Sequence, residues 1–322
     1  MVAAVRTTVL IATRDRPPLL RECLDSLAAC DLGGAEVLIL DQSGGTESAG
    51  IVRAAAAGGA PFRHVPLDTR GKSKSLNAGI AMARGDVIMV TDDDCVVAPG
   101  WLHAFHDVFE NEGGDGRVLV TGRVLPGRHA PDGTPPPSCI EEPRPSDYSG
   151  RPGREVMYQN WAVPRRAFEE VGPFDERLGP GAPLRNAEDN DMAYRLLRAG
   201  YRILYRPQVV VWHNGWRSRE GIISLKWDYG VGQGAFYVKH ICRGDLHIAG
   251  RFARDALRLA RHAATSLLRG DPHSSRGNAT FLAGLLTGGA LMAPRAFRRT
   301  PWDPPVPRPA AGAWRRPRGK ER

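Results

Sequence analysis

The chain has 322 residues, of which 42% are hydrophobic and 25% are charged. This composition indicates a globular protein with one large or two small cores rather than a disordered chain. No apolar run reaches about 18 residues, so we expect no membrane-spanning helix, and nothing predicts a secretory signal. The five scattered cysteines form no CxxC pair, which argues against a disulfide framework or a thiolate zinc site and suits a reducing cytosol.

The net charge of +9 is unevenly distributed. Nine Lys or Arg and two Asp or Glu lie from Pro294 onward, so this tail carries +7. A basic tail is typical of contact with an anionic partner, such as a membrane surface or nucleic acid. A solvated, disordered tail explains the same composition, and the sequence leaves both interpretations open.

The first half of the chain alternates between predicted strands and helices. Apolar runs predict strands at residues 9–12, 36–41, 62–65 and 87–90. Helical spacing predicts helices at residues 17–30, 51–57 and 73–83. This alternation predicts a parallel sheet with helices on both faces, whose ligands bind outside the carboxyl ends of the strands. Thr13, Arg14 and Asp41 follow the first two strands, so a nucleotide is expected beside them.

The pattern breaks after Arg123. Residues 125–154 are rich in Pro, Gly and Ser, which predicts a long irregular segment, either a linker or a lid over a bound donor. Regular structure is predicted to resume with a helix beginning near Ala187, a turn at Gly200 and two short strands ending at His213. Residues 218–294 are predicted to be mostly helical.

Three consecutive carboxylates, Asp92, Asp93 and Asp94, follow soon after the buried strand predicted at residues 87–90. Adjacent carboxylates repel one another, and each loses hydration beside a packed sheet. An Asp here would cap a helix beginning at Pro99, but one Asp is enough for that purpose. Mg²⁺ or Mn²⁺ prefers carboxylate oxygens and would cancel the repulsion, so we favour a metal site.

A second acidic group, Glu188, Asp189 and Asp191, opens the helix predicted near Ala187. Acids at a helix N-terminus interact favourably with the helix dipole by about 0.3–1 kcal/mol each, which is the simpler explanation. The functional alternative is a general base at the mouth of a site. His213 supports this alternative because it ends an apolar strand and is a candidate metal ligand.

Arg70, Lys72 and Lys74 lie around the start of the helix predicted at residues 73–83. Basic side chains and free backbone amides at a helix start are suited to phosphate. Their spacing is not that of a Walker loop. GVGQGAF at residues 230–236 does not follow a strand, so we interpret it as helix packing and not as a dinucleotide site.

In this order, the segments resemble the family 2 glycosyltransferases, which have a GT-A fold and invert the configuration of the transferred sugar. The resemblance covers residues 8–214. It rests on six segments: ATRDRPPLLRECLDSL, LILDQS, GKSKSLNAGIAMARGDVIMVTDDD, NWAVPRRAFEEVGPFDERLG, AEDNDMAYRLLRAGYRILYRP and VVWH. It implies a GT-A-like, doubly wound, mostly parallel α/β sheet with a C-terminal helical extension.

The resemblance also implies the donor side of an active site. Asp92 and Asp94 match the DxD pair as metal ligands, and Asp92 is also expected to contact the nucleotide-sugar donor. Asp93 occupies the variable position, and a shifted register that uses Asp93 at the donor stays open. The other expected donor contacts are Thr13, Arg14, Asp41, Arg70 and Lys74.

The catalytic roles follow from the same resemblance. His213 is expected to complete the site for Mg²⁺ or Mn²⁺, which would neutralise the departing diphosphate. Asp189, oriented by Glu188, is expected to deprotonate the acceptor hydroxyl, so that one displacement inverts the anomeric carbon. Asn160 and Trp161 are expected on the acceptor side. The expected reaction is hexosyl or deoxyhexosyl transfer to a glycan, lipid-linked or small-molecule acceptor.

The chain is expected to contain a catalytic domain at residues 1–215, a helical region at 216–294 and a basic tail at 295–322. The helix predicted at residues 248–270 has Phe252, Ala256, Leu259 and Ala263 on one side. Arg251, Arg254, Arg258 and Arg261 lie largely elsewhere. Such a helix either packs on its own domain or lies on an anionic membrane. The apolar segment at residues 280–294 is too short to span a membrane but could enter its interface.

Two rival functions use the same features. A nucleotidyltransferase would need a Gly-rich phosphate loop after the first strand, and ATRDRPP has none. A non-catalytic protein that binds an anion or nucleic acid through its tail would leave the Asp cluster, Asp189 and His213 without a task. We therefore expect no nucleic-acid partner, and we expect a cytoplasmic protein that can be peripheral at the inner face of the membrane.

Overall fold

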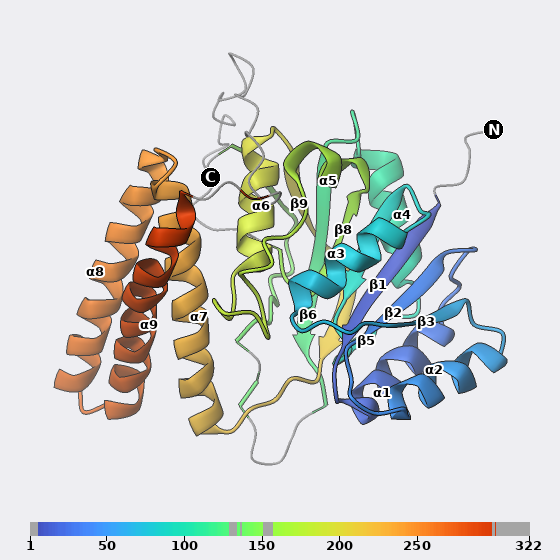
Figure 1. Ribbon diagram of the computed structural model, residues 1–322, viewed down its shortest axis with the longest axis horizontal. Helices are drawn as coiled ribbons and strands as arrows, with labels where there is room; N and C mark the ends of the chain where they lie inside the picture. The colour runs from blue at the N-terminus through green and yellow to red at the C-terminus, as the bar shows by residue number, and fades with distance from the viewer. Residues whose placement is uncertain (1–5, 129–133, 136, 151–156, 298–299, 301–322) are drawn as a thin grey trace.

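The computed structural model describes residues 6–128, 134–135, 137–150, 157–297 and 300. The predicted alternation of strands and helices in the first half is confirmed (Figure 1). Its elements are β1 (Thr7–Thr13), α1 (Pro17–Ala28), β2 (Glu36–Asp41), α2 (Glu47–Ala57), β3 (Phe62–Pro66), α3 (Lys72–Met82) and β4 (Val87–Thr91). β1, β2 and β4 are almost wholly buried, as expected for parallel strands that are covered on both faces.

The described residues form one sheet of nine strands, in the order β3-β2-β1-β4-β8-β6-β9-β5, with β7 paired to β9. The first four strands in this order are parallel, and β8 pairs antiparallel with β4. The later strands are β5 (Cys95–Val97), β6 (Val118–Pro126), β7 (Ser146–Tyr148), β8 (Asn160–Pro164) and β9 (Arg202–His213). The chain runs outward from β1 to β3 and returns to β4 on the other side of β1. Ligands of open α/β sheets bind at such a switch point.

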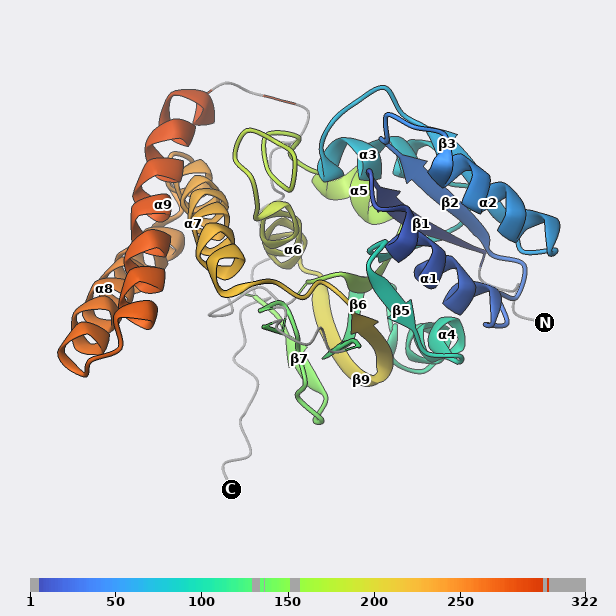
Figure 2. The same ribbon diagram turned by 90° about the horizontal axis from the view of Figure 1, so that it is seen from below.

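Helices cover both faces of the sheet (Figure 2). Val9 and Ile11 of β1 enter one core with α1, α2 and α4 (Trp101–Glu112). Leu10, between them, enters a second core with α3, α5 (Arg166–Val171) and α6 (Glu188–Arg198). Successive side chains of a strand point to opposite faces, so a continuous apolar run supplies both cores. The predicted α/β class is confirmed.

The two short strands predicted before His213 are instead one strand, β9, although Pro207 lies inside it. On the neighbouring strand β6, Gly122 pairs with Arg206 and Arg123 pairs with Val210, so the register shifts past Pro207. Proline has no N–H to donate to a ladder, and this irregularity accommodates it without ending the strand. One continuous strand therefore carries His213 to the functional edge of the sheet.

The Pro-rich segment at residues 125–154 is more regular than predicted. β7 adds to the sheet beside β9, and a bridge joins Thr134 to Arg217 just before the C-terminal helices. Pairing with β9 gives the backbone N–H and C=O groups of β7 hydrogen-bond partners, which a Pro-rich composition does not predict. Residues 129–133, 136 and 151–154 of this segment lie outside the described residues. Its role as a lid stays a prediction.

The predicted helical region consists of α7 (Arg219–Ile241), α8 (Leu246–Leu268) and α9 (Pro272–Ala296), beside α6 (Figure 1). GVGQGAF packs α7 against α9, as predicted, because a Cβ on Gly234 would lie 1.9 Å from the Leu285 carbonyl oxygen. The apolar segment at residues 280–294 is not a separate short element but the second half of the 25-residue α9. No described helix is both long and apolar enough to cross a membrane.

The predicted apolar side of α8 packs inward. Phe252, Ala256 and Leu259 contact the core formed by α6, α7 and α9. Arg251 was expected away from this side, but it is only 4% exposed, with its guanidinium 5.6 Å from the centre of the Tyr237 ring. A cation over an aromatic face is attracted by the ring, which explains its inward position. Nearly all of the predicted basic tail lies outside the described residues.

Candidate active site

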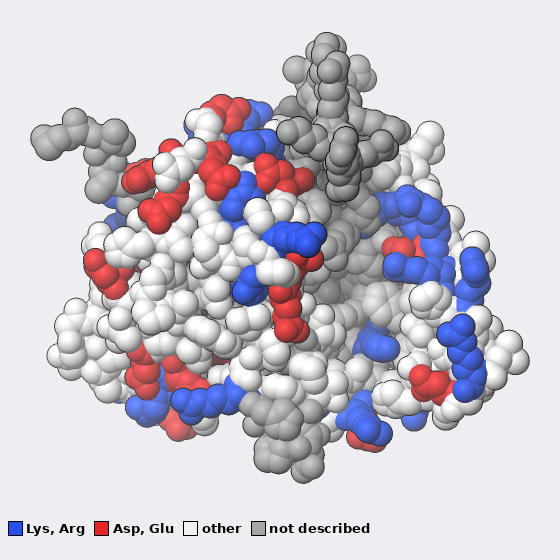
Figure 3. Space-filling model, turned by 180° about the vertical axis from the view of Figure 1, so that it is seen from behind, with Lys and Arg blue, Asp and Glu red and all other residues white. Residues whose placement is uncertain are grey.

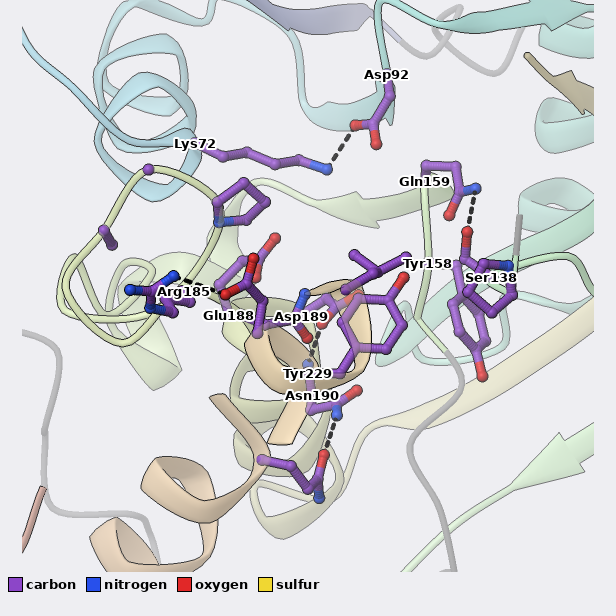
Figure 4. Close-up of a pocket in the computed structure, with 18 of the residues that line it drawn as sticks. Lys72, Asp92, Ser138, Tyr158, Gln159, Arg185, Glu188, Asp189, Asn190 and Tyr229 are labelled. Carbon is purple, nitrogen blue, oxygen red and sulfur yellow. Dashed lines mark hydrogen bonds and ion pairs between the residues drawn. The ribbon is translucent and has the colours of Figure 1, made fainter. Parts of the chain in front are cut away.

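A cavity of about 1100 Å³ opens at the carboxyl ends of β1 and β4 and extends beside α6 and α7 (Figure 4). The predicted site residues that line it are Thr13, Arg14, Arg70, Asp92, Asp94, Glu188, Asp189 and His213. The fold therefore brings the predicted metal, donor and base residues to one site, although they span the sequence from residue 13 to residue 213.

The three carboxylates after β4 do not all face this cavity. Asp92 and Asp94 line it, whereas Asp93 is fully buried beneath them. The Thr13 hydroxyl donates a 2.7 Å hydrogen bond to Asp93, and Arg16 lies 2.5 Å from its other oxygen. Burial raises the pKa of Asp93 to about 7, against the opposing effect of Arg16. Asp92 and Asp94 face the cavity and Asp93 faces away from it, as the DxD spacing requires. This arrangement argues against the alternative in which Asp93 contacts the donor.

Two basic side chains compensate the crowded acids. Arg16 reaches Asp94 at 2.8 Å as well as Asp93, and Lys72 Nζ lies 2.5 Å from Asp92. The N-cap of α4 is Gly100, and no side chain caps that helix, so helix capping does not explain the cluster. The sequence argument that repulsion alone requires a metal is therefore incomplete, because the protein supplies its own cations.

Asp94 and His213 nevertheless form an arrangement that fits a divalent cation. Strand β5 pairs with β9 so that Cys95 lies opposite His213, which places Asp94 Oδ1 3.3 Å from His213 Nε2. This buried oxygen accepts no hydrogen bond from a described residue. Burial would raise the pKa of Asp94, but His213 and then Arg16 hold it below its usual range. An ionised carboxylate beside an imidazole is a metal donor set, with Asp92 on the same cavity wall.

Gln159 orients His213. Its side-chain amide nitrogen donates a 2.8 Å hydrogen bond to His213 Nδ1, and the other ring nitrogen, Nε2, is directed to Asp94. With Nδ1 as the acceptor, Nε2 carries the ring proton and faces Asp94, and it must release that proton to bind a metal. Cys95 is close enough to join this cluster, but burial raises the pKa of its thiol well above the ordinary value. A protonated thiol is a poor ligand for a hard cation, so Cys95 is not a candidate.

Glu188 and Asp189 approach from the other side of the cavity, at the first turn of α6 (Figure 4). Ala187 precedes them in a left-handed conformation, with φ of 70°, and turns the chain into the helix. Burial, with the charge of Asp189, raises the pKa of Glu188 to about 8. Burial raises the pKa of Asp189 to about 6, and the charge of Lys72 opposes the rise. The pair therefore holds one protonated and one ionised carboxyl group near neutral pH.

A buried ionic network fixes the position of α6. Asp191, two residues beyond Asp189, contacts Lys239 at 2.8 Å and His240 at 3.0 Å, both from α7. Lys239 also contacts Asp175 at 2.9 Å, and all three side chains of this Lys–Asp group are fully buried. The same lysine thus ties α6 and α7 together below Glu188 and Asp189.

Besides Asp93, two more predicted donor residues lie outside the cavity lining. Asp41 is buried, where it accepts from the Ser43 amide at 2.9 Å and contacts His64 Nε2 at 2.8 Å. Lys74 is exposed on α3, and Lys72 lines the cavity in its place. Residues two apart on a helix differ by about 200° in direction, so only one of the two lysines can face the site. The choice of Lys74 was wrong in this respect.

The two predicted acceptor-side residues are also misplaced, since Asn160 and Trp161 are buried in the sheet. The Asn160 oxygen accepts a 2.9 Å hydrogen bond from the Trp101 indole, and its amide donates to backbone carbonyls. The Trp161 ring packs against Phe174 with centroids 6.0 Å apart. Both side chains stabilise the core, because the two faces of β8 are covered by the two hydrophobic cores.

Sequence reasoning missed several residues of the cavity or its walls. Arg16 has a signal, since it lies in the RDRPP segment directly after β1, but nothing local shows that it turns back to the Asp cluster. Gln159 adjoins the predicted Asn160. Tyr229, from α7, lines the cavity near Glu188 and Asp189, and burial raises its pKa to about 12. No sequence pattern indicates that α7 reaches the site.

Comparison with known proteins accounts for this arrangement. Residues 8–170 match the profile described as glycosyl transferase family 2. The chain belongs to glycosyl transferase family 2. One relative of this family 2 chain is a Haloferax volcanii protein named glucosyl-dolichyl phosphate glucuronosyltransferase. The two are 29% identical over 159 residues, which cover 47% of this chain and 50% of the relative. A second relative is the pre-mycofactocin glycosyltransferase of Mycobacterium tuberculosis. It is 27% identical to this chain over 244 residues, which cover 72% of this chain and 48% of the relative. The chain spans about half the length of these curated relatives.

Solved structures confirm the predicted GT-A-like fold for this family 2 chain. A Pyrobaculum calidifontis mannosyltransferase, solved with GDP-Man and Mn²⁺, has a TM-score of 0.60 at 18% identity, covering 89% of this chain and 88% of that one. TarS of S. aureus has a TM-score of 0.51 at 18% identity, covering 80% of this chain and 43% of that one. At these identities the likeness concerns the fold alone.

Proposed function

We propose that this chain is an inverting, metal-dependent glycosyltransferase that moves a hexosyl or deoxyhexosyl group from a nucleotide sugar to an acceptor hydroxyl. One observation carries the proposal. Asp92, Asp94 and His213 at the sheet edge and the Glu188–Asp189 pair on α6 line a single cavity. The relatives named as glycosyltransferases and the neighbour solved with GDP-Man and Mn²⁺ support this class of donor and cofactor.

The donor side would bind a nucleoside diphosphate through charge. Arg14, Arg70 and Lys72 line the cavity and can neutralise phosphate oxygens. Mg²⁺ or Mn²⁺ held by Asp94, His213 and Asp92 would supply Lewis-acid stabilisation of the leaving diphosphate. Lys72 would then exchange part of its contact with Asp92 for the phosphate, since its side chain already lies between the two acidic groups.

The acceptor side would rely on the Glu188–Asp189 pair. Ionised Asp189 would accept the proton as the acceptor oxygen attacks the anomeric carbon, while the bond to the diphosphate breaks on the opposite side. Protonated Glu188 would keep a second negative charge away from the reacting centre. A single displacement inverts the configuration. The acceptor hydroxyl would belong to a glycan, a lipid-linked sugar or a small molecule, and Tyr229 and Gln233 of α7 contribute to the cavity wall.

We also propose that the chain divides into a catalytic domain at residues 1–215 and a helical region at residues 216–294. The helical region is not independent of the chemistry, because α7 supplies part of the cavity wall. We also propose a cytoplasmic setting at the inner face of a membrane. The five free cysteines support a reducing compartment.

The rate of transfer is expected to rise with pH through about 6, the raised pKa of Asp189. Below that value the carboxyl group is protonated and cannot accept the acceptor proton, so kcat/KM should fall about tenfold per pH unit. The measurement is a pH profile of kcat/KM under conditions where the enzyme stays folded. A profile that is flat from about pH 4.5 to 7 would contradict the assignment of Asp189 as base.

Donor binding is expected to depend on the cation. In a thermal-shift screen, one of the UDP-, GDP- or dTDP-sugars should raise Tm with Mn²⁺ present and have little effect with EDTA, because a ligand of the folded state stabilises it by mass action. Asp94→Asn should remove the Mn²⁺ effect, since it removes a charged ligand. An equal shift with and without the cation would exclude metal-dependent donor binding.

A further inference from the structure

Large apolar side chains are exposed on one part of the molecule. Of the eight that are exposed among the described residues, seven lie between Leu246 and Phe297, on α8 and α9 or at their ends, and the other is Trp212. Leu246, Leu268 and Phe297 are 83%, 87% and 75% exposed. Single exposed apolar residues need no explanation, but a concentration on two adjacent helices marks a surface that has a partner.

Helix α8 is apolar on two opposite sides. Its inner side packs on α7 and α9 through Ile248 and Phe252. A second row of apolar or small residues, spaced three or four apart, is exposed along its outer side: Leu246, Gly250, Ala253, Leu257, Ala260, Ala264 and Leu268. A helix that is apolar on both sides is normally covered on both. We call this row and its counterpart on α9 the outer face.

The counterpart on α9 has the same spacing. Its exposed residues are Ala279, Ala283, Leu286, Ala290 and, just after the helix, Phe297. No charged residue occurs in the sequence from Gly277 to Pro294. The two helices lie side by side and are joined by a short turn (Figures 1 and 2). Both therefore present apolar rows that the rest of the described chain does not cover.

The charges beside these rows are positive. Arg254, Arg261 and Arg269 are exposed on α8 or at its end, whereas Arg258 pairs with Asp255 at 3.0 Å. The one acid within α8, Asp255, is turned inward, where it accepts a hydrogen bond from the Tyr237 hydroxyl. Figure 3 shows basic side chains gathered along the edge of the molecule that α8 forms, with few acidic ones. An apolar stripe flanked by arginines is complementary to an anionic lipid surface.

We propose that the outer face of α8 and α9 docks in the plane of an anionic phospholipid bilayer. Leu246, Leu257 and Leu268 would enter the boundary between headgroups and acyl chains, and the arginines beside them would contact lipid phosphates. At 23 residues, α8 extends about 35 Å along the surface. A second copy of this chain is a weaker candidate, because two copies would bring their arginine rows together.

Docking would also hold one end of the cavity about 10 Å, one helix diameter, from the membrane. The cavity that contains Asp189 is lined at its other end by Arg258 and Leu259 of α8 and by Phe281 of α9. Leu259 and Phe281 lie on the inner side of these helices, so the sugar of a lipid-linked acceptor would have to extend past them to reach the base. This consequence rests on the proposed function, whereas docking itself needs neither donor nor acceptor.

The test is co-sedimentation of the full chain with vesicles of phosphatidylcholine, with or without phosphatidylglycerol. The native protein should bind only the anionic vesicles, and less as salt increases. Leu257→Glu with Leu268→Glu should reduce the partition coefficient about tenfold or more, because it places two charges of the wrong sign in the apolar row. Both side chains are exposed, so the variant should fold normally.

A matched control adds the same two charges elsewhere. Ala54→Glu with Ala57→Glu changes exposed residues of α2, at the opposite end of the molecule, and should leave vesicle binding within about twofold. Equal losses in both variants would mean that only net charge matters and would overturn the proposal. So would an absence of binding to anionic vesicles. A native dimer that Leu257→Glu with Leu268→Glu converts to a monomer, without vesicle binding, would instead assign the outer face to a second copy. Because no sugar is transferred in this assay, its outcome is separate from that of the proposed function.

Discussion

Asp189→Asn is expected to abolish sugar transfer while leaving donor binding nearly intact. The amide has almost the same shape as the carboxylate but cannot accept the acceptor proton. Loss of a general base reduces rates by about 10²–10⁴-fold. Asp189 lies across the cavity from Asp92, so its replacement should not disturb the donor subsite. The comparison needs kcat for transfer and the donor Kd for each protein.

The control for this experiment is Asp107→Asn, an exposed residue of α4 outside the cavity. It makes the same chemical change and should leave both quantities unchanged. If Asp189→Asn weakened donor binding as much as it slowed transfer, Asp189 would belong to the donor site and not be the base. The same variant should also lose the rise in activity through about pH 6, since the group that titrates there is gone.

Lys239→Met is expected to cause the largest loss of stability. Lys239 is fully buried between Asp175 and Asp191, at 2.9 and 2.8 Å. Burial would raise the pKa of Asp191, but Lys239 and Arg195 hold it well below the ordinary value. Without the lysine, two buried carboxylates lose a shared counter-ion, and removing one partner of such a pair lowers the free energy of unfolding by about 3–5 kcal/mol. Urea denaturation of the two proteins measures this difference.

Lys226→Met on the same helix is the matched control, because Lys226 is only half-buried, and we expect a change within about 1 kcal/mol. Adding Asp191→Asn to Lys239→Met should restore part of the lost stability, since it removes one of the uncompensated charges. A loss of under about 1 kcal/mol in Lys239→Met would show that the network does not hold α6 against α7.

Much of the fold was predictable because its signals are local. The apolar runs and helical spacings of the first half appear in the structure as β1 to β4 and α1 to α3. The failures occurred where distant pairing decides. Pro207 suggested two short strands, but a shift in register against β6 accommodates it in one. A Pro-rich composition suggested an irregular segment, but β7 pairs with β9 from within it.

In the candidate site, too, the sequence indicated which residues matter but not which way their side chains point. The sequence indicated the acidic cluster, the Glu188–Asp189 pair and His213, and these line one cavity. It did not indicate that Arg16 and Lys72 neutralise the cluster, or that Asn160 and Trp161 face the core. Polar residues at strand ends look alike in sequence whether they point into a cleft or into a core.

The sequence by itself determined the α/β class, the family resemblance and the order of the acidic and basic segments, because each depends on residues close together in the chain. Only the tertiary structure decided which of those side chains meet, which are buried, and which face of α8 stays exposed. Contact between side chains depends on how strands and helices far apart in the sequence pack together. Local periodicity defines an element and its apolar side, but the neighbours that cover that side come from elsewhere in the chain.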